Sequence, residues 1–290
     1  MRLKIFHRTT YTYGLPARSN INELRLAPEE THRQQPGPLQ IRVTPNSELD
    51  EARDLFGNLV HSFEVEEKHA TLEIIAESEV QTHFDPTLPE MAHQIELPDS
   101  PEIEDDLVHD FLVDCTFVER NTAIWREAVD IRLNCEATYG SVVQGLSDFI
   151  FESCTYREQI VHLMTTAAEV QSEKIGTCQD FAHLLLAYCR ALGIPARYIS
   201  GYLYDPGIEA ATQPEFIGAE STHAWVEVYV PQVGWIGIDP TNRRWVDEHY
   251  VTVAFGRDYH DVAPVRGSLL GGGRRRTIDV EVAVKALPDA

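Results

Sequence analysis

The sequence lacks the features that mark several large classes of protein. Its five cysteines, at positions 115, 135, 154, 178 and 189, are odd in number and include no Cys-x-x-Cys pair, so they predict neither a disulfide framework nor a zinc site. Positive charge is also scarce, because 24 Lys and Arg stand against 46 Asp and Glu for a net charge of −22. An acidic chain repels phosphate backbones and anionic lipid. We therefore expect neither nucleic acid nor a membrane as a partner.

Long apolar runs and closely spaced metal ligands are missing as well. No stretch approaches the roughly 18–20 apolar residues of a membrane span, and no apolar run follows the basic N-terminal residues as in a secretory signal. The histidines in the N-terminal third have no close ligand spacing, so we expect no metal and no cofactor. These absences and the unpaired set of cysteines predict a soluble, cytoplasmic protein in a reducing compartment.

The pattern along the chain predicts two domains. The 290 residues are enough for one large or two modest domains, each with a core. Short alternating runs between Pro, Gly and Asn turns predict an antiparallel β domain over residues 1–84, and four prolines then predict a connector over 85–100. The second domain is expected over 101–265, with a helix starting at Ser100–Glu102, helices to about residue 192 and strands after Pro195. Residues 266–290 are expected to form a C-terminal strand with an undetermined packing partner.

Cys178 lies in the first turn of a predicted helix. Thr177 precedes a run of good helix formers as a cap, and Gly193 and Pro195 end the helix. A helix N-terminus carries unpaired N–H groups and about half a positive charge, which favour a thiolate and can donate hydrogen bonds to an oxyanion. Cys178 is therefore a candidate nucleophile.

The helical period separates the side chains of this segment into two sides. Cys178 falls on the apolar, packed stripe, whereas Asp180, His183 and Arg190 fall on the opposite side. His183 therefore points away from the sulfur, and we do not expect it to act as the base.

A histidine and an aspartate downstream supply a base and a group to orient it. The run Ser221–Val230 alternates as a strand that places His223 and Trp225 on one face. A second strand, Gly234–Asp239, follows a predicted turn, so the two strands form a hairpin. Antiparallel pairing brings Asp239 near the start of the first strand, where its carboxylate can accept a hydrogen bond from the imidazole. Cys178, His223 and Asp239 are the predicted catalytic residues.

Four blocks occur in an order that resembles the bacterial transglutaminase-like cysteine protease family. They read GTCQDFAH (residues 176–183), LGIPARYISGY (192–202), THAWVEVY (222–229) and GWIGIDPTN (234–242). The resemblance extends to HRTTYTY, ELRLAP and DLFGNLV near the N-terminus and to GRDYHDVAPVRG near the C-terminus. It implies an α+β fold in which a papain-like, transglutaminase-like core of helices packed on an antiparallel sheet follows a small antiparallel β domain. It also carries the catalytic roles over to Cys178, His223 and Asp239.

Four further residues are candidates for supporting roles. Gln179 and Asp180 either support the site through hydrogen bonds or cap the first helical turn. Trp225 and Trp235 are expected to wall the site as packing residues. The loop over residues 205–220, which is rich in glycine and proline, precedes His223 and is expected to cover the cleft.

Together these residues predict a thiol-dependent acyl-transfer enzyme that acts on an amide of a peptide or protein. If water resolves the acyl-enzyme, the protein is a hydrolase of the cysteine peptidase or amidase type, which the resemblance favours. If an amine resolves it, the protein is a transglutaminase. A non-catalytic binding module with the same fold is the alternative from another class. The oligomeric state is not predicted.

Overall fold

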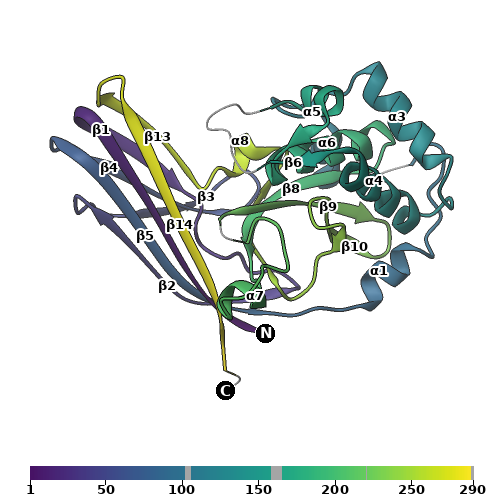
Figure 1. Cartoon of the computed structure of the whole chain (residues 1–290), viewed down its shortest axis with the longest axis horizontal. Helices are drawn as coiled ribbons and strands as arrows, with labels where there is room; N and C mark the ends of the chain where they lie inside the picture. The colour runs from purple at the N-terminus through teal and green to yellow at the C-terminus, as the bar shows by residue number, and fades with distance from the viewer. Residues whose placement is uncertain (102–105, 158–164, 220, 289–290) are drawn as a thin grey trace.

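The computed structural model describes residues 1–101, 106–157, 165–219 and 221–288, and Figure 1 shows a large, strongly twisted sheet beside a second region of helices and strands. The described part confirms the α+β fold class. The helix start predicted at Ser100–Glu102 extends into residues outside the described part.

The strands are β1 (Arg2–Leu24), β2 (Gln34–Thr44), β3 (Asp50–Arg53), β4 (Leu59–Val65), β5 (His69–Thr82), β6 (Thr155–Tyr156), β7 (Ile175–Gly176), β8 (Ala196–Leu203), β9 (His223–Val230), β10 (Gly234–Asp239), β11 (Arg244–Trp245), β12 (Tyr250–Gly256), β13 (Val265–Gly271) and β14 (Arg276–Leu287). The helices are α1 (Thr87–Ala92), α2 (Asp106–His109), the short η1 (Asp110–Leu112), α3 (Thr122–Arg132), α4 (Tyr139–Ser153), α5 (Ala167–Glu173), α6 (Cys178–Ala191), α7 (Pro206–Glu209) and α8 (Tyr259–Val262).

The large sheet is built around β1. Its first half pairs with β5 on one side and β14 on the other, and its second half pairs with β4 and β13. The C-terminal segment therefore returns to the first strand, and Arg2 lies opposite Leu287. The sequence left open the packing partner of the C-terminal segment, and its two strands, β13 and β14, both pair with β1.

The twisted sheet packs against the second region through apolar side chains. Leu3 and Ile5 of β1 form one buried cluster with Tyr202 of β8 and Val251 of β12. Because this cluster contains residues from both regions, the two regions share a core.

The second region consists of a central helix on an antiparallel sheet. The strand order is β11-β10-β9-β8-β12, and α6 packs on β8 and β9 while α3, α4 and α5 surround it. The predicted helix over residues 178–192 and the predicted hairpin of β9 and β10 are both present.

The expected polar side of α6 is buried, which corrects the division read from the helical period. His183 is stacked on Phe117 with ring centroids 5.1 Å apart and accepts a hydrogen bond from the Tyr259 N–H. Arg190 is 1% exposed and donates to backbone carbonyl groups of residues 113, 196 and 257. Periodicity could not show this, because neighbouring elements on all sides supply partners for the polar groups.

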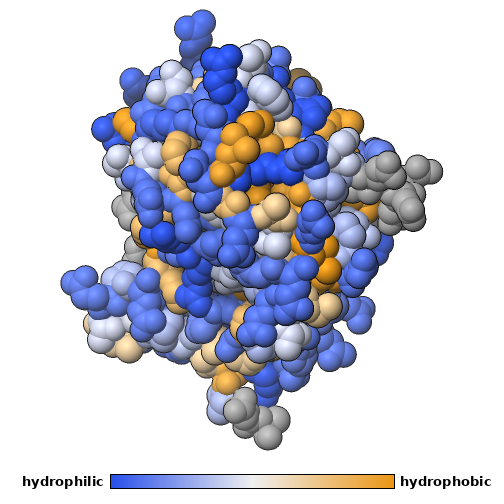
Figure 2. Space-filling model, turned by 90° about the vertical axis from the view of Figure 1, so that its right-hand side faces the viewer, coloured by the Kyte–Doolittle hydropathy of each residue, from blue (hydrophilic) through white to orange (hydrophobic). Residues whose placement is uncertain are grey.

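The connector contains a short helix. α1 follows Pro86 and packs on α4, where a Cβ added to Gly140 would lie 2.6 Å from His93. The face formed by the helices is mostly hydrophilic, with small separate apolar patches (Figure 2). Among the described residues, no helix has the length and apolar character needed to span a bilayer.

Candidate functional site

Cys178 is the first residue of α6, and the helix start is capped next to it. The N–H and the hydroxyl of Thr177 donate to Asp180 Oδ2 over 2.8 and 2.9 Å. Asp180 therefore caps the first turn, which was one of its two predicted roles. The N–H groups of Cys178 and Gln179, at the first two helical positions, have no acceptor within the helix. They are available to a group bound near the Cys178 sulfur. Cys178 itself is 6% exposed.

His223 and Asp239 meet at one end of the β9–β10 hairpin. His223 begins β9 and Asp239 ends β10, and the register pairs Ile238 with Val226. His223 Nε2 and Asp239 Oδ2 are 2.8 Å apart, and both side chains are fully buried. The hairpin thus places these two residues as the sequence predicted.

The Asp239 carboxylate is held by several donors besides His223. Oδ1 accepts from the N–H groups of Thr241 and Asn242 over 2.8 and 3.3 Å, and Oδ2 accepts from Asn242 Nδ2 and the Tyr250 hydroxyl over 2.8 Å each. Burial alone raises the pKa of Asp239, but the charge and hydrogen bond of His223, together with Asn242 and Tyr250, outweigh burial and lower it. The carboxylate is therefore charged and fixed in orientation.

The imidazole of His223 is placed between Asp239 and Cys178. Burial lowers the pKa of His223, but the nearby Asp239 carboxylate, followed by Cys178, reverses this effect and raises the pKa to about 10. Nδ1, the nitrogen that does not bind Asp239, is buried and makes no standard hydrogen bond to a described residue. This arrangement places a positively charged imidazole beside the Cys178 sulfur.

The loop before His223 closes over the imidazole. Gly218 has a φ of +85°, and a Cβ added there would lie 2.6 Å from His223 Nδ1. Asp205 holds the start of the loop by accepting hydrogen bonds from Gly207, Glu215 and Phe216 N–H groups over 2.6–2.7 Å. The described part of the predicted covering loop therefore lies against the imidazole of His223.

Asn242 connects this loop to the aspartate. Its Oδ1 accepts from the Ile217 N–H over 2.8 Å, and its Nδ2 donates to the Ile217 carbonyl over 3.1 Å as well as to Asp239. One side chain, Asn242, therefore contacts both the loop and the Asp239 carboxylate.

The two predicted wall residues have different locations. Trp225 is fully buried, and its ring centroid lies 6.2 Å from that of His223 and 5.2 Å from that of Tyr250. It therefore packs beside the imidazole of His223. Trp235 lies at the other end of β10, where Arg197 covers its ring at 4.4 Å. The structure therefore does not bring Trp235 to the side chains of Cys178, His223 and Asp239. Gln179 is half-buried, and its side chain makes no hydrogen bond to a described residue.

Sequence reasoning missed Gly218, Asn242 and Tyr250. Asn242 stands three residues after Asp239, a spacing at which a side chain can bond back across a turn, and this signal could have been used. A glycine five residues before a candidate base, as Gly218 is, is a weaker signal. Tyr250 comes from β12 and gave no local signal.

A second cluster of polar side chains lies between β11 and β12. Ligand atoms of Asp247, Glu248 and His249 come within 4.8 Å of one another. However, Asp247 is already paired with Arg244 and lies 2.9 Å from His249 Nδ1. We therefore interpret the cluster as an ion-paired turn and assign no metal to it.

Comparisons of the sequence with known proteins find transglutaminase-like matches over most of the chain. Residues 127–240 match the transglutaminase-like superfamily, and residues 3–81 match the bacterial transglutaminase-like N-terminal region. The uncharacterized protein Rv2569c of Mycobacterium tuberculosis is 33% identical over 98% of this chain and 92% of its own length. A protein-glutamine gamma-glutamyltransferase of Pseudomonas aeruginosa is 36% identical, over 23% of this chain and 10% of its own length.

A solved structure extends the similarity to the whole fold. It is a candidate cysteine protease from Cytophaga hutchinsonii, which superposes with a TM-score of 0.78 at 26% identity. The match covers 100% of this chain and 92% of that protein.

Proposed function

Because the chain belongs to the transglutaminase-like superfamily, we propose that it is a thiol-dependent acyl-transfer enzyme that cleaves an amide bond of a peptide or protein. Cys178 is the nucleophile, His223 the acid and base, and Asp239 the group that orients the imidazole. The observation that carries this proposal is the buried 2.8 Å contact between His223 and Asp239 beside Cys178. The similarity to the Cytophaga protein supports a cysteine peptidase or amidase.

The proposed reaction has two steps. In the first, the Cys178 thiolate attacks the amide carbonyl carbon, and the N–H groups at the start of α6 donate to the oxyanion. The C–N bond then breaks as the His223 imidazolium gives its proton to the leaving amine, and a thioester remains. In the second, neutral His223 takes a proton from water, the resulting hydroxide displaces the thiolate, and a carboxylic acid leaves.

A protein transglutaminase is the second candidate. The Pseudomonas relative carries that name, which supports an amine rather than water as the group that resolves the thioester. The first step is the same in both cases, so only the acceptor distinguishes them.

A peptide library digested by the protein and read by mass spectrometry, with and without a primary amine, tests the proposal. We expect new peptide termini from a peptidase, and ammonia with amine incorporation from a transglutaminase. Cys178→Ala should remove either activity, whereas Cys154→Ala, which changes a half-buried cysteine outside the site, should keep it. Full activity in Cys178→Ala would overturn the proposal. A folded wild type without either activity would favour the binding module.

We also propose that the protein works in the cytoplasm. All five cysteines are unpaired in the structure, which suits a reducing compartment. Cell fractionation tests this, and native protein in a periplasmic or secreted fraction would contradict it.

A further inference from the structure

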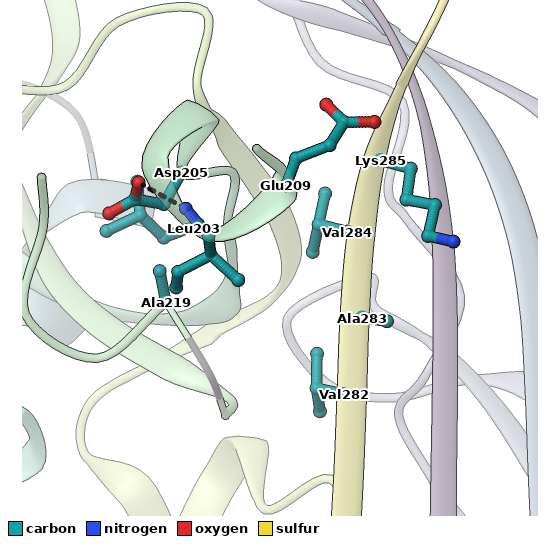
Figure 3. A pocket seen from close by; sticks show the side chains of 9 residues that line it. Leu203, Asp205, Glu209, Ala219, Val282, Ala283, Val284 and Lys285 are labelled. Carbon is teal, nitrogen blue, oxygen red and sulfur yellow. Dashed lines mark hydrogen bonds between the residues drawn. The ribbon is translucent and has the colours of Figure 1, made fainter. Parts of the chain in front are cut away.

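A cavity lies between the loop that covers His223 and strand β14. Its volume is about 560 Å³, which falls in the range of ligand pockets. One wall comes from the second domain and the other from Val282–Lys285 of β14 (Figure 3). Val282 and Val284 project from β14 toward the wall formed by Leu203 and Ala219, while Lys285 projects to the other side of the strand.

The cavity is next to the proposed catalytic residues. Ala219 lines it, and the preceding residue, Gly218, is the one that contacts His223 Nδ1. Consecutive Cα atoms are about 3.8 Å apart, so the cavity wall begins one residue from the glycine that touches the base. Because Gly218 and Ala219 are adjacent in the chain, the loop that lies against the His223 imidazole also forms part of the cavity wall.

The lining favours uncharged aliphatic side chains. Asp205 is saturated by backbone N–H groups at the start of the loop. Glu209 accepts from the Tyr204 hydroxyl over 2.6 Å and from the Ala286 N–H over 3.3 Å. Both carboxylates in the lining are therefore engaged, and the walls between them include Leu203, Ile208, Ala219, Val282 and Val284.

β14 also presents a free backbone edge to the cavity. Among the described strands it pairs only with β1, and the N–H of Ala286 points away from β1 toward Glu209. Backbone groups of alternate residues in a strand point to the same side, so the N–H and C=O groups of Val282 and Val284 also face outward. Apart from the bond at Ala286, no described residue hydrogen-bonds to this edge.

From these observations we propose that the cavity is a substrate subsite that receives an extended peptide with aliphatic side chains. The peptide adds as a strand to the edge of β14 at Val282 and Val284, and its alternate side chains enter the cavity. This inference rests on the proposed function, because it names the class of substrate that reaches Cys178. It also gives the C-terminal strand a part in substrate choice.

Binding to the Cys178→Ala protein tests the subsite without turnover. The probes are two fluorescent decapeptides with valine or serine at alternate positions, and a third that is the valine peptide with alternate backbone N-methyl groups. We expect the valine peptide to bind, and the serine and N-methyl peptides to bind at least about 10-fold more weakly, because apolar burial or backbone pairing is lost.

A pair of lysine substitutions in the same protein supplies the matched control. Val282→Lys places a charge in the cavity and should weaken binding of the valine peptide about 10-fold or more. Val280→Lys, two residues away on the same strand, is outside the lining, is already 46% exposed and should leave binding unchanged. Circular dichroism and thermal melting check that both variants fold. If Val282→Lys does not fold, the comparison of the peptides decides.

Equal binding of all peptides, or no binding of the valine peptide, would overturn the subsite. Unchanged affinity in folded Val282→Lys would do the same. Selective binding without any turnover by the wild type would support the subsite and refute the proposed function. Turnover of the valine peptide with the same KM in Val282→Lys on a wild-type background would support the function and overturn the subsite.

Discussion

Gly218 lies against the imidazole of His223, so closely that a Cβ added to it would be 2.6 Å from Nδ1. The backbone of Gly218 also has a positive φ of 85°, a value that residues other than glycine adopt only with strain. The same imidazole contacts Asp239 on its other nitrogen. The base is consequently confined between a glycine and a carboxylate.

Replacement of this glycine should impair catalysis more than folding. Gly218→Ala should reduce kcat/KM roughly 100-fold, because displacing a reacting group by about 1 Å has an effect of that size. Steady-state kinetics and a thermal melt measure the two effects. Gly234→Ala is the matched control, since Gly234 has a φ of +94° with nothing within 4 Å of an added Cβ, and it should retain activity. Equal kinetics for the two variants would contradict the argument.

Tyr250 is predicted to be a positioning residue for the aspartate. Its hydroxyl donates to the Asp239 oxygen that also binds His223, over 2.8 Å in both cases. Tyr250→Phe should lower kcat/KM about 10-fold or more, because a hydrogen bond to a buried charge contributes roughly 1.5–3 kcal/mol. Tyr202→Phe removes a buried hydroxyl that bonds to His7 instead, and it should retain kcat. A Tyr250→Phe enzyme with wild-type kinetics at every pH would show that the bond does not position the site.

The pH dependence of cysteine alkylation reports on the base. The pKa of His223 is raised to about 10, so the imidazolium beside the Cys178 sulfur persists through neutral pH and is lost as pH rises through that value. Iodoacetamide should therefore modify Cys178 below pH 8, and faster than Cys189, whose pKa is raised to about 12 by burial.

Asp239→Asn should slow the alkylation of Cys178. It should also move the pH at which the imidazolium of His223 is lost to a lower value, because the Asp239 carboxylate is the main group that raises the pKa of His223. Mass spectrometry of the labelled peptides gives the rates. Equally slow labelling of all five cysteines in the wild type would contradict the proposed ion pair.

His7 is predicted to make the contact between β1 and β8 sensitive to acid. It is buried, bonds to Tyr202 and Thr9 over 2.9 Å each, and has its pKa lowered by burial to about 4. Because the unfolded chain takes up the proton first, this contribution to stability is complete above the ordinary pKa of 6.5 and is lost as pH falls toward 4. The loss is up to about 3 kcal/mol in the free energy of unfolding.

Urea unfolding between pH 7 and pH 4 measures this effect. His7→Gln should flatten the pH dependence, whereas substitution of the exposed His83 by glutamine should leave it as in the wild type. A pH dependence that is the same in all three proteins would contradict the role of His7.

Local patterns in the amino-acid sequence were enough to predict the elements that carry the proposed catalytic residues. The cap and period of residues 177–191 specify a helix with Cys178 in its first turn, and the alternating strands around one turn specify a hairpin. Both patterns depend on neighbours within about twenty residues, so hydrogen bonding and side-chain periodicity are sufficient to predict them. The contact between His223 and Asp239 follows from the same hairpin.

The features that join distant segments of the chain became visible only in the three-dimensional fold. The pairing of β14 with β1 connects the two ends of the chain, and Tyr250 reaches Asp239 from another strand. The burial of His183 and Arg190, the location of Trp235 away from the base and the cavity beside Ala219 likewise depend on which elements pack together. Local patterns show which face of an element is apolar, but the partner that covers it is selected by packing across the whole chain.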